Sequence, residues 1–97
     1  MLEKSIERRL VDGVKSVGGK AYKFISPGSP GAPDRIVVLP GGVVMFVELK
    51  TKNGKLSAYQ EMRIAELRNL NVDVYVLNGK AEVDWFLGVV KEKCRGL

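Results

Sequence analysis

Histidine is absent from the sequence, and cysteine occurs once, as Cys94. The lack of histidine excludes Ser/His and Cys/His nucleophile pairs, histidine general bases and histidine-rich metal sites. The single cysteine excludes an internal disulfide framework and zinc sites built on paired cysteines. Any catalysis must therefore use carboxylates, lysines, hydroxyl groups and a bound cation.

Long apolar runs are also missing. No apolar run reaches the roughly 18 residues that a membrane-spanning helix requires. The N-terminal stretch MLEKSIERRLVDG alternates charged residues with single apolar residues, unlike a secretory signal. We therefore expect a cytoplasmic protein. A chain of 97 residues can bury one modest core, which predicts a single domain over residues 1–97.

Acidic residues are fewer than basic ones. The chain has 16 Lys and Arg against 11 Asp and Glu, a net charge of +5. A basic balance favours a polyanionic partner through counterion release, although many basic proteins bind none. The tripeptide NGK occurs twice, but neither copy has the glycine spacing or the following Ser/Thr of a Walker-type phosphate loop. A nucleotide cofactor is not expected.

Apolar spacing and turn residues predict seven elements. Gly18-Gly19 should end the first helix, Pro40–Gly42 should form a hairpin turn, and Ser57 with Gln60 has the form of a capping box. The apolar positions Met62, Ala65, Leu67 and Leu70 suggest the second helix, and Asn78-Gly79 should form a turn. The predicted elements are a helix over 2–17, strands over 20–26, 35–39 and 43–50, a helix over 58–70, a strand over 72–77 and a closing helix over 81–94.

The predicted hairpin carries charged residues at its open end. Pairing Leu39 with Val43 across the turn places Asp34 directly opposite Glu48. Opposed residues have Cβ atoms only about 4.5–5.5 Å apart, so the two carboxylates would repel each other unless a cation lay between them. The sequence therefore predicts a divalent-cation site at this end of the hairpin.

Mg²⁺ suits such a site, because it binds through one or two carboxylates and keeps positions for water or substrate phosphate. The backbone carbonyl of Leu49 could complete the ligands. Lys50 lies on the same strand face as Glu48, where an ammonium can hold attacking water and offset charge on phosphorus. This layout is typical of a phosphodiesterase.

Each piece also has an ordinary structural explanation. An Asp before a strand is commonly a turn residue, and Glu-Leu-Lys at a strand end is commonly a solvated face. The conjunction favours function, since Asp34, Glu48 and Lys50 gather at one end of adjacent strands. The preceding loop SPGSPGAP is rich in glycine and proline and would let a phosphate backbone approach closely.

Glu7 and Gln60 are two further candidates. Glu7 falls inside the apolar arc of the first helix, where an unpaired carboxylate is costly. Its partner would be a metal–water cluster or a lysine such as Lys23 or Lys50, or equally a structural Arg or Lys at the core edge. Gln60 is explained by capping, yet it could also reach back to the metal site.

The predicted DNA contacts are basic residues near the same centre, namely Lys23, Arg35, Lys52 and Lys55. Lysines in a polar loop are commonly just solvated, so this assignment is a hypothesis. Tyr59 and Trp85 could stack on bases, but isolated aromatic residues more often fill core or surface space.

The order of these motifs resembles the PD-(D/E)XK nuclease superfamily. Pro33-Asp34 is followed fourteen positions later by Glu48-Leu49-Lys50, within a helix-strand-strand-strand-helix-strand order. The stretch from Tyr22 to Gln60, with its GAPDRIV and ELK blocks and the following Gln, is similar to the VRR-NUC family in its stand-alone, phage-type form. The resemblance implies an α/β fold with a restriction-endonuclease-like core, in which helices flank a mixed sheet.

Carried over by residue, the resemblance implies a full set of site roles. They are Asp34, Glu48 and the Leu49 carbonyl as metal ligands, Lys50 as catalytic lysine, Gln60 as motif glutamine and Glu7 as the acidic residue of the first helix. It further implies Mg²⁺, with Mn²⁺ substituting, and a homodimer that acts like a Holliday-junction resolvase. A phage-encoded member would work in the bacterial host cytoplasm.

The leading hypothesis is a metal-dependent endonuclease for branched DNA that leaves 5′-phosphate and 3′-hydroxyl ends. Two alternatives stay open. The enzyme could instead be a nickase or a flap or linear-duplex nuclease, or the chain could be a non-catalytic basic module that binds nucleic acid. The stretch VDWFLGVV would offer apolar surface for dimerisation.

Overall fold

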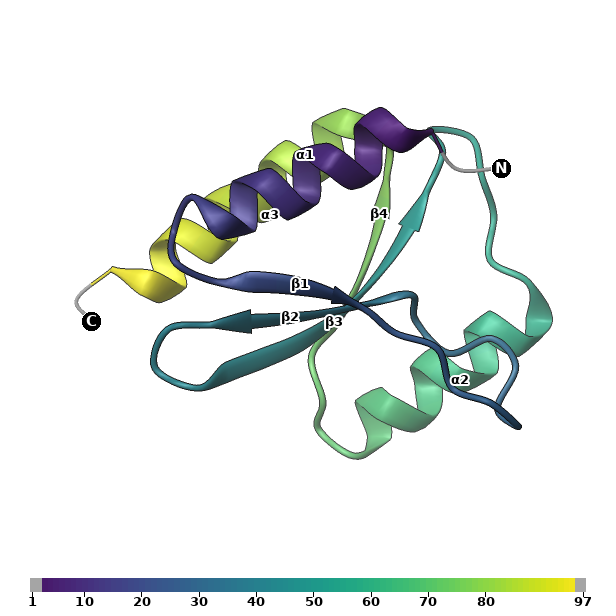
Figure 1. Ribbon diagram of the computed structural model, residues 1–97. Coiled ribbons are helices and arrows are strands. Elements are labelled where there is room, and N and C mark those ends of the chain that lie inside the picture. Colours follow the sequence, from purple (N-terminus) through teal and green to yellow (C-terminus); the bar gives the residue numbers. More distant parts are fainter. Residues whose placement is uncertain (1–2, 96–97) are drawn as a thin grey trace.

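The computed structural model describes residues 3–95 and contains three helices and four strands. The elements follow the order that the sequence predicts, a helix, three strands, a helix, a strand and a closing helix (Figure 1). The elements are α1 (Lys4–Lys15), β1 (Lys20–Lys23), β2 (Arg35–Leu39), β3 (Val43–Lys50), α2 (Ala58–Asn69), β4 (Val74–Asn78) and α3 (Gly79–Cys94).

The four strands form one mixed sheet in the order β1-β2-β3-β4. The first three strands are antiparallel neighbours, and β4 runs parallel to β3 after the α2 crossover. Leu39 pairs with Val43 and Arg35 with Val47, which is the register predicted from the hairpin turn. The predicted α/β class with a mixed sheet is therefore confirmed.

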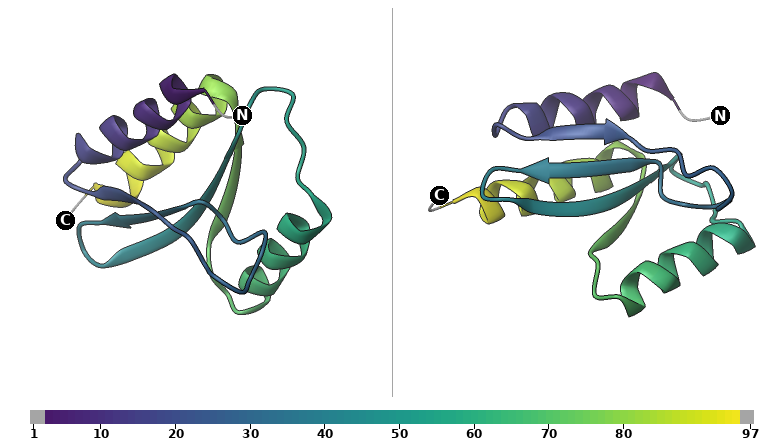
Figure 2. Two further views of the ribbon diagram at one scale, coloured as in Figure 1. Left: turned by 45° about the vertical axis from the view of Figure 1, so that its right-hand side comes forward. Right: turned by 60° about the horizontal axis from the view of Figure 1, so that its bottom comes forward.

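The sheet separates α1 and α3 from α2. Helices α1 and α3 lie side by side on one face of the sheet, whereas α2 lies against the other face (Figures 1 and 2). Odd-numbered residues of β2 and β3 point to the α1/α3 face because side chains alternate along a strand. These strand residues form the main core with residues of α1 and α3. The strands contribute Val37, Leu39, Met45, Val47 and Leu49, and the helices contribute Ile6, Leu10, Val14, Val83, Phe86 and Val90. This core fixes β3, whose end carries Glu48.

The predicted helix α2 is present, but few of its apolar residues are buried. Ile64 is its buried residue, while Met62 and Leu70 are 43% and 74% exposed. Ala65 is also exposed and Leu67 is half-buried. Apolar residues occur on several sides of this helix, so their spacing could not identify the face that contacts the sheet. Only a small part of α2 is therefore held by core packing.

Several element boundaries also differ from the prediction. α1 ends at Lys15, and β1 stops at Lys23 because its partner β2 begins at Arg35. Gly79, with φ of 77°, is the first residue of α3 rather than part of a separate turn. Leu2, the predicted start of the first helix, lies outside the described residues. None of these shifts moves the open end of the hairpin.

The predicted apolar stretch over residues 83–90 lies in the middle of α3 and is partly buried. Val83, Phe86 and Val90 are fully buried, while Trp85 is 59% exposed. Three of the eight residues in this stretch are therefore used in the core and are not available for contact between chains. No helix within residues 3–95 combines the length and apolar character needed to cross a bilayer.

Candidate active site

Asp34 and Glu48 meet at the open end of the β2–β3 hairpin. Asp34 directly precedes Arg35, which pairs with Val47, so the register brings Asp34 beside Glu48. The Asp34 backbone N–H donates to Glu48 Oε1 at 3.2 Å, and Asp34 Oδ1 accepts from the Leu49 N–H at 3.2 Å. The carboxyl group of each residue is thus fixed by backbone of the opposite strand.

Burial makes these two carboxyl groups hard to ionise together. Glu48 is only 4% exposed. Desolvation, followed by the negative charge of Asp34, raises the pKa of Glu48 to about 7 despite the opposing effect of Lys50. Burial also raises the pKa of Asp34, although the Leu49 N–H and the Arg35 guanidinium act against that rise. This end of the sheet therefore has chemistry that favours a positive ligand.

Pro33 explains why the strand pairing stops at this point. Residues Arg35 and Val37 pair with Val47 and Met45, so the same register places Pro33 opposite Leu49. Proline has no N–H to donate and is found at strand ends for that reason. In an antiparallel pair, a residue directs its N–H and C=O to the same neighbour. With no backbone partner at Pro33, the Leu49 N–H donates to Asp34 Oδ1 instead. By the same rule the Leu49 carbonyl faces the β2 side of β3 and has no N–H from Pro33 to accept.

Gln60 connects the start of α2 to Glu48. Its side-chain oxygen accepts from the Ser57 N–H at 2.8 Å, and the Ser57 hydroxyl accepts from the Gln60 N–H at 3.1 Å, which confirms the capping box. The other end of the same amide, Nε2, donates to Glu48 Oε2 at 3.0 Å. Gln60 therefore caps α2 and contacts Glu48 in the same conformation.

Lys50 lies on the Glu48 side of β3. Its Nζ is 3.7 Å from Glu48 Oε2, and its side chain is 20% exposed. The ammonium is therefore next to the acidic pair while it still contacts solvent. A substrate phosphate approaching the pair would also approach this charge.

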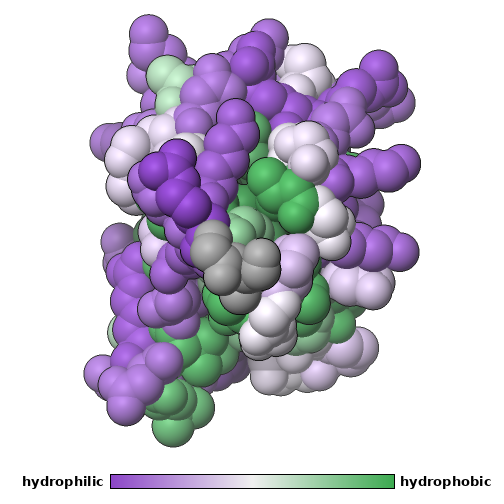
Figure 3. All heavy atoms as spheres, turned by 90° about the vertical axis from the view of Figure 1, so that its left-hand side faces the viewer, coloured by the Kyte–Doolittle hydropathy of each residue, from purple (hydrophilic) through white to green (hydrophobic). Residues whose placement is uncertain are grey.

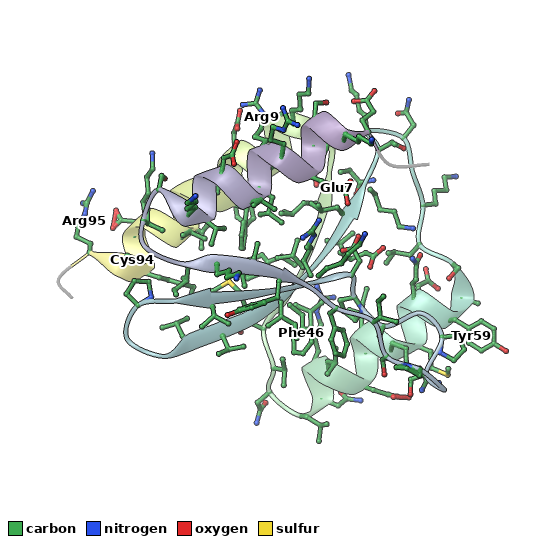
Figure 4. The ribbon with its side chains drawn as sticks, in the orientation of Figure 1. Glu7, Arg9, Phe46, Tyr59, Cys94 and Arg95 are labelled. Atoms are coloured by element: carbon green, nitrogen blue, oxygen red, sulfur yellow. The ribbon has the colours of Figure 1, made fainter. Side chains whose placement is uncertain are left out.

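Glu7 pairs with Arg35, which lies beside Asp34 in the sequence. The Arg35 guanidinium donates to Glu7 Oε1 at 3.3 Å and to the Ala21 carbonyl at 3.3 Å. Figure 4 shows Glu7 projecting from α1 toward the sheet. The partner is thus an arginine at the core edge, rather than Lys23 or Lys50. Helical position predicted that Glu7 needs a partner, but which cation reaches it depends on tertiary packing.

The loop before Asp34 is attached to α2. A Cβ atom on Gly31 would lie 2.6 Å from the Tyr59 oxygen and 2.7 Å from the Gln60 nitrogen, so only glycine permits this approach. Arg63 Nε also donates to the Pro30 carbonyl at 3.1 Å. Sequence reasoning missed both contacts, although the position of Gly31 shortly before Asp34 was a signal. These contacts attach the loop before Asp34 to the helix that carries Gln60.

The predicted DNA-binding residues fall into two groups. Lys23, Lys52 and Lys55 are exposed. Arg35 differs, because its side chain is 13% exposed and is already bound to Glu7. Tyr59 is 58% exposed at the outer start of α2, as Figure 4 also shows.

Known proteins share both the sequence motifs and the fold of this chain. Residues 6–81 match the family model described as VRR-NUC domain. The chain belongs to the VRR-NUC family. A VRR_NUC domain of known structure superposes with a TM-score of 0.83 at 30% identity, over 89% of this chain and 94% of that one. The fold and the membership inferred from sequence motifs are both confirmed.

A phage relative of this VRR-NUC chain is similar over most of its length. It is the protein named "Putative nuclease p44" from Acyrthosiphon pisum secondary endosymbiont phage 1. The two are 47% identical over 78 residues, which are 80% of this chain and 84% of that protein. The VRR-NUC chain is accordingly a nuclease-family protein with a phage-encoded relative.

Proposed function

We propose that this VRR-NUC chain is a divalent-metal-dependent DNA endonuclease. One observation carries the proposal: the buried Glu48 carboxyl lies against Asp34, and its pKa is raised to about 7. Each carboxyl group accepts a hydrogen bond from backbone of the opposite segment, and the charge of Asp34 raises the pKa of Glu48, so a cation shared between them would relieve the repulsion. Both residues are anchored on β2–β3, which suits a preorganised site.

The donor atoms fit Mg²⁺. Asp34 and Glu48 would supply carboxylate oxygens and Leu49 its backbone carbonyl, a set of hard oxygen ligands that suits Mg²⁺, with Mn²⁺ as substitute. Within residues 3–95 no group of three or more Asp, Glu or Cys side chains could hold a metal. Water and substrate phosphate would therefore fill the other positions. A bound ion would supply Lewis-acid stabilisation of the phosphate and activate water.

Lys50 and Gln60 would assist in different ways. The Lys50 ammonium, 3.7 Å from Glu48, would orient the attacking water and offset the negative charge that develops on phosphorus. Gln60 would hold the Glu48 carboxyl in one orientation through its 3.0 Å hydrogen bond. In-line attack by water would release 5′-phosphate and 3′-hydroxyl ends.

Glu7 would act through Arg35 rather than on the substrate. The pair holds the guanidinium at the start of β2, where the charge of Arg35 lowers and that of Glu7 raises the pKa of Asp34. Glu7 is in this proposal a positioning residue. Arg35 shares that role, since its buried guanidinium has little access to a DNA backbone.

The substrate would be branched DNA, cut by a homodimer. The family resemblance to Holliday-junction resolvases supports this assignment, and the phage relative supports a role in the bacterial host cytoplasm. The exposed Lys23, Lys52 and Lys55 would contact phosphates near the cut. A nickase or a flap or linear-duplex nuclease would use the same residues on a different DNA shape.

Cleavage of labelled four-way junction, flap, nicked and linear DNA tests the proposal. With Mg²⁺ or Mn²⁺ we expect paired incisions in the junction, and loss of cleavage with EDTA or in Asp34→Ala, Glu48→Ala and Lys50→Ala variants. Loss of one catalytic group typically costs about 10²-fold or more in rate. DNA cleavage by a variant that carries all three substitutions would refute the proposed site. Cleavage of linear DNA alone by wild type would refute the junction preference.

The net charge of +5 favours one competing function, a basic module that binds nucleic acid without cutting it. That function predicts salt-dependent binding of the same DNA panel, no cleavage under any metal condition and no uptake of Mn²⁺. The raised pKa of Glu48 argues against it, because a binding module has no use for two carboxyl groups forced together.

A further inference from the structure

A basic groove follows α1 from Lys4 to Asp12 and reaches Lys80 at the start of α3. The two helices are parallel, and their first turns lie at the same end of the molecule (Figures 1 and 2). The groove has a volume of about 440 Å³ and is lined by Lys4, Ser5, Arg8, Arg9, Asp12 and Lys80. Four of these six residues are cationic and one is acidic, so the groove is suited to an anionic ligand.

The cations in this groove are only partly neutralised. Arg9, which projects to the outer side of α1 in Figure 4, pairs with Asp84 at 3.0 Å. Among residues 3–95, Lys4, Arg8 and Lys80 have no carboxylate within 4.0 Å. Lys4 and Lys80 also lie in first turns, where the helix dipole disfavours a positive charge. Like charges gathered in this way become favourable when an anion joins them.

The groove continues toward the proposed catalytic centre. Lys80 also lines a neighbouring cavity of about 590 Å³, together with Thr51, Lys52 and Asn53. Thr51 and Lys52 directly follow Lys50 at the end of β3. Glu3 and Glu82 line this second cavity as well, and Glu82 accepts from the Asn78 N–H at 2.9 Å. Lys80 therefore lies on the boundary between the groove and this cavity.

We propose that this groove binds the phosphodiester backbone of DNA outside the scissile phosphate. The strand would pass from Lys50 and Lys52 across Lys80 to Lys4 and Arg8. This inference rests on the proposed nuclease function and names where the enzyme holds its substrate. The contacts would be to phosphates, so they would add affinity with little sequence preference.

The matched test compares two double variants of the full chain. Arg8→Gln with Lys80→Gln removes two charges from the groove, and Lys91→Gln with Lys93→Gln removes two from the last turn of α3. That last turn lies at the other end of the helices, on the side of the molecule facing the viewer in Figure 3. Glutamine retains the aliphatic stem and helix propensity, so both variants should fold.

Binding of a fluorescein-labelled four-way junction is measured by anisotropy in EDTA at several KCl concentrations. The groove variant should bind roughly tenfold or more weakly, and its log K against log salt slope should shrink by about two, one for each lost phosphate contact. The rate at saturating enzyme with Mg²⁺ should stay near that of wild type. Equal affinities and equal salt slopes for the two double variants would refute the proposal that this groove binds DNA.

These outcomes separate the two proposals. If the groove variant alone weakens binding but no protein cuts any DNA, the groove stands and the nuclease function fails. If wild type cuts with metal while both double variants bind equally well, the nuclease stands and the groove fails. A Lys80→Glu variant adds a check, since charge reversal should weaken binding further than neutralisation.

Discussion

At the scale of single residues, the carboxyl group of Glu48 determines the character of the site. Its side chain is 6% exposed, and it accepts hydrogen bonds from the Asp34 N–H and from Gln60. These donors do not outweigh the loss of water and the nearby charge of Asp34, which is why its pKa rises to about 7. Ionisation in the absence of metal therefore costs stability.

We expect stability without metal to fall as the pH rises from about 4.5 through about 7. Folding raises this pKa, so the folded state holds the proton more tightly, and that advantage is present at low pH and lost above about 7. The full effect is roughly 3 kcal/mol. Urea unfolding in EDTA at several pH values measures it.

Glu48→Gln should remove most of this pH dependence and exceed wild type in stability at about pH 8, because a neutral amide replaces the buried charge. The control is Glu61→Gln, an exposed position in the same region, which should behave as wild type. A Glu48→Gln profile parallel to that of wild type would contradict this account.

Pro33 is expected to keep the Leu49 carbonyl available. In Pro33→Ala the new N–H would pair with that carbonyl and extend the β2–β3 ladder. Mn²⁺ affinity should fall by about tenfold, the size of effect seen when groups around a metal ligand change. Amide exchange by NMR should find a protected N–H at position 33. Pro27→Ala, in the same loop but exposed, should change neither quantity.

Some contacts between residues could be predicted from the sequence and others could not. Asp34 opposite Glu48 follows from counting along a hairpin, since strand periodicity and a short turn leave one register. The contact between Glu7 and Arg35 spans α1 and β2, and helical periodicity gives a direction but no partner. The groove residues Lys4, Arg8 and Lys80 come together only through helix packing, so no local pattern could identify them.

At the scale of elements, the site depends on the attachment of α2 to the loop before β2. This helix buries Ile64 but otherwise contributes little to the core, so its position depends on local contacts at its start. Those contacts are the close approach of Gly31, the Arg63 bond to Pro30 and the capping box at Ser57. The hydrogen bond from Gln60 to Glu48 depends on all of them.

Gly31→Ala should displace the first turn of α2. The added Cβ would collide with the Tyr59 and Gln60 backbone, and φ of +88° is itself unfavourable for alanine. We expect a loss of about 1–3 kcal/mol in unfolding free energy and weaker Mn²⁺ binding, since Gln60 would no longer fix Glu48. Chemical unfolding and calorimetry measure the two effects.

Gly28 provides a matched control for that substitution. It also has a positive φ, of +79°, but no atom lies within 4 Å of the position of an added Cβ. Gly28→Ala should therefore carry the backbone cost without the collision, and it should leave Mn²⁺ affinity unchanged. Equal metal affinity in the two alanine variants would show that the contact with α2 does not matter to the site.

Sequence patterns predicted some elements better than others. β2 and β3 are confirmed at Arg35–Leu39 and Val43–Lys50 because the PGG turn and the alternation of faces fix both ends. The pattern predicted that α2 is a helix but not which of its sides contacts the sheet, because its apolar residues are scattered around the helix. The ends of β1 and β4 shifted because their lengths depend on what their neighbours pair with.

At the scale of the whole molecule, the apolar surface that remains exposed lies mainly outside α1 and α3. The large apolar side chains concerned are Tyr22, Ile25, Val44, Tyr59, Met62, Leu70 and Trp85. A homodimer would bury part of such surface and bring two sites to one DNA junction. This arrangement has a functional consequence that mixing experiments can measure.

Mixed dimers of wild type and Asp34→Asn should nick a four-way junction in one strand. Each dimer would have one competent site, so paired incisions should fall roughly as the square of the wild-type fraction, as expected for random pairing of subunits. Gel analysis of a cruciform plasmid distinguishes nicked from linear product. Paired incisions that fall only in direct proportion to the wild-type fraction would contradict the two-site dimer.

Calorimetric titration of the protein with Mn²⁺ near pH 8, above the raised pKa of Glu48, measures whether Asp34 and Glu48 jointly hold one divalent cation. We expect binding to wild type and to Lys91→Gln, and loss of measurable binding in both Asp34→Asn and Glu48→Gln. Unchanged Mn²⁺ affinity in either of the last two variants would show that the two carboxyl groups do not share a cation.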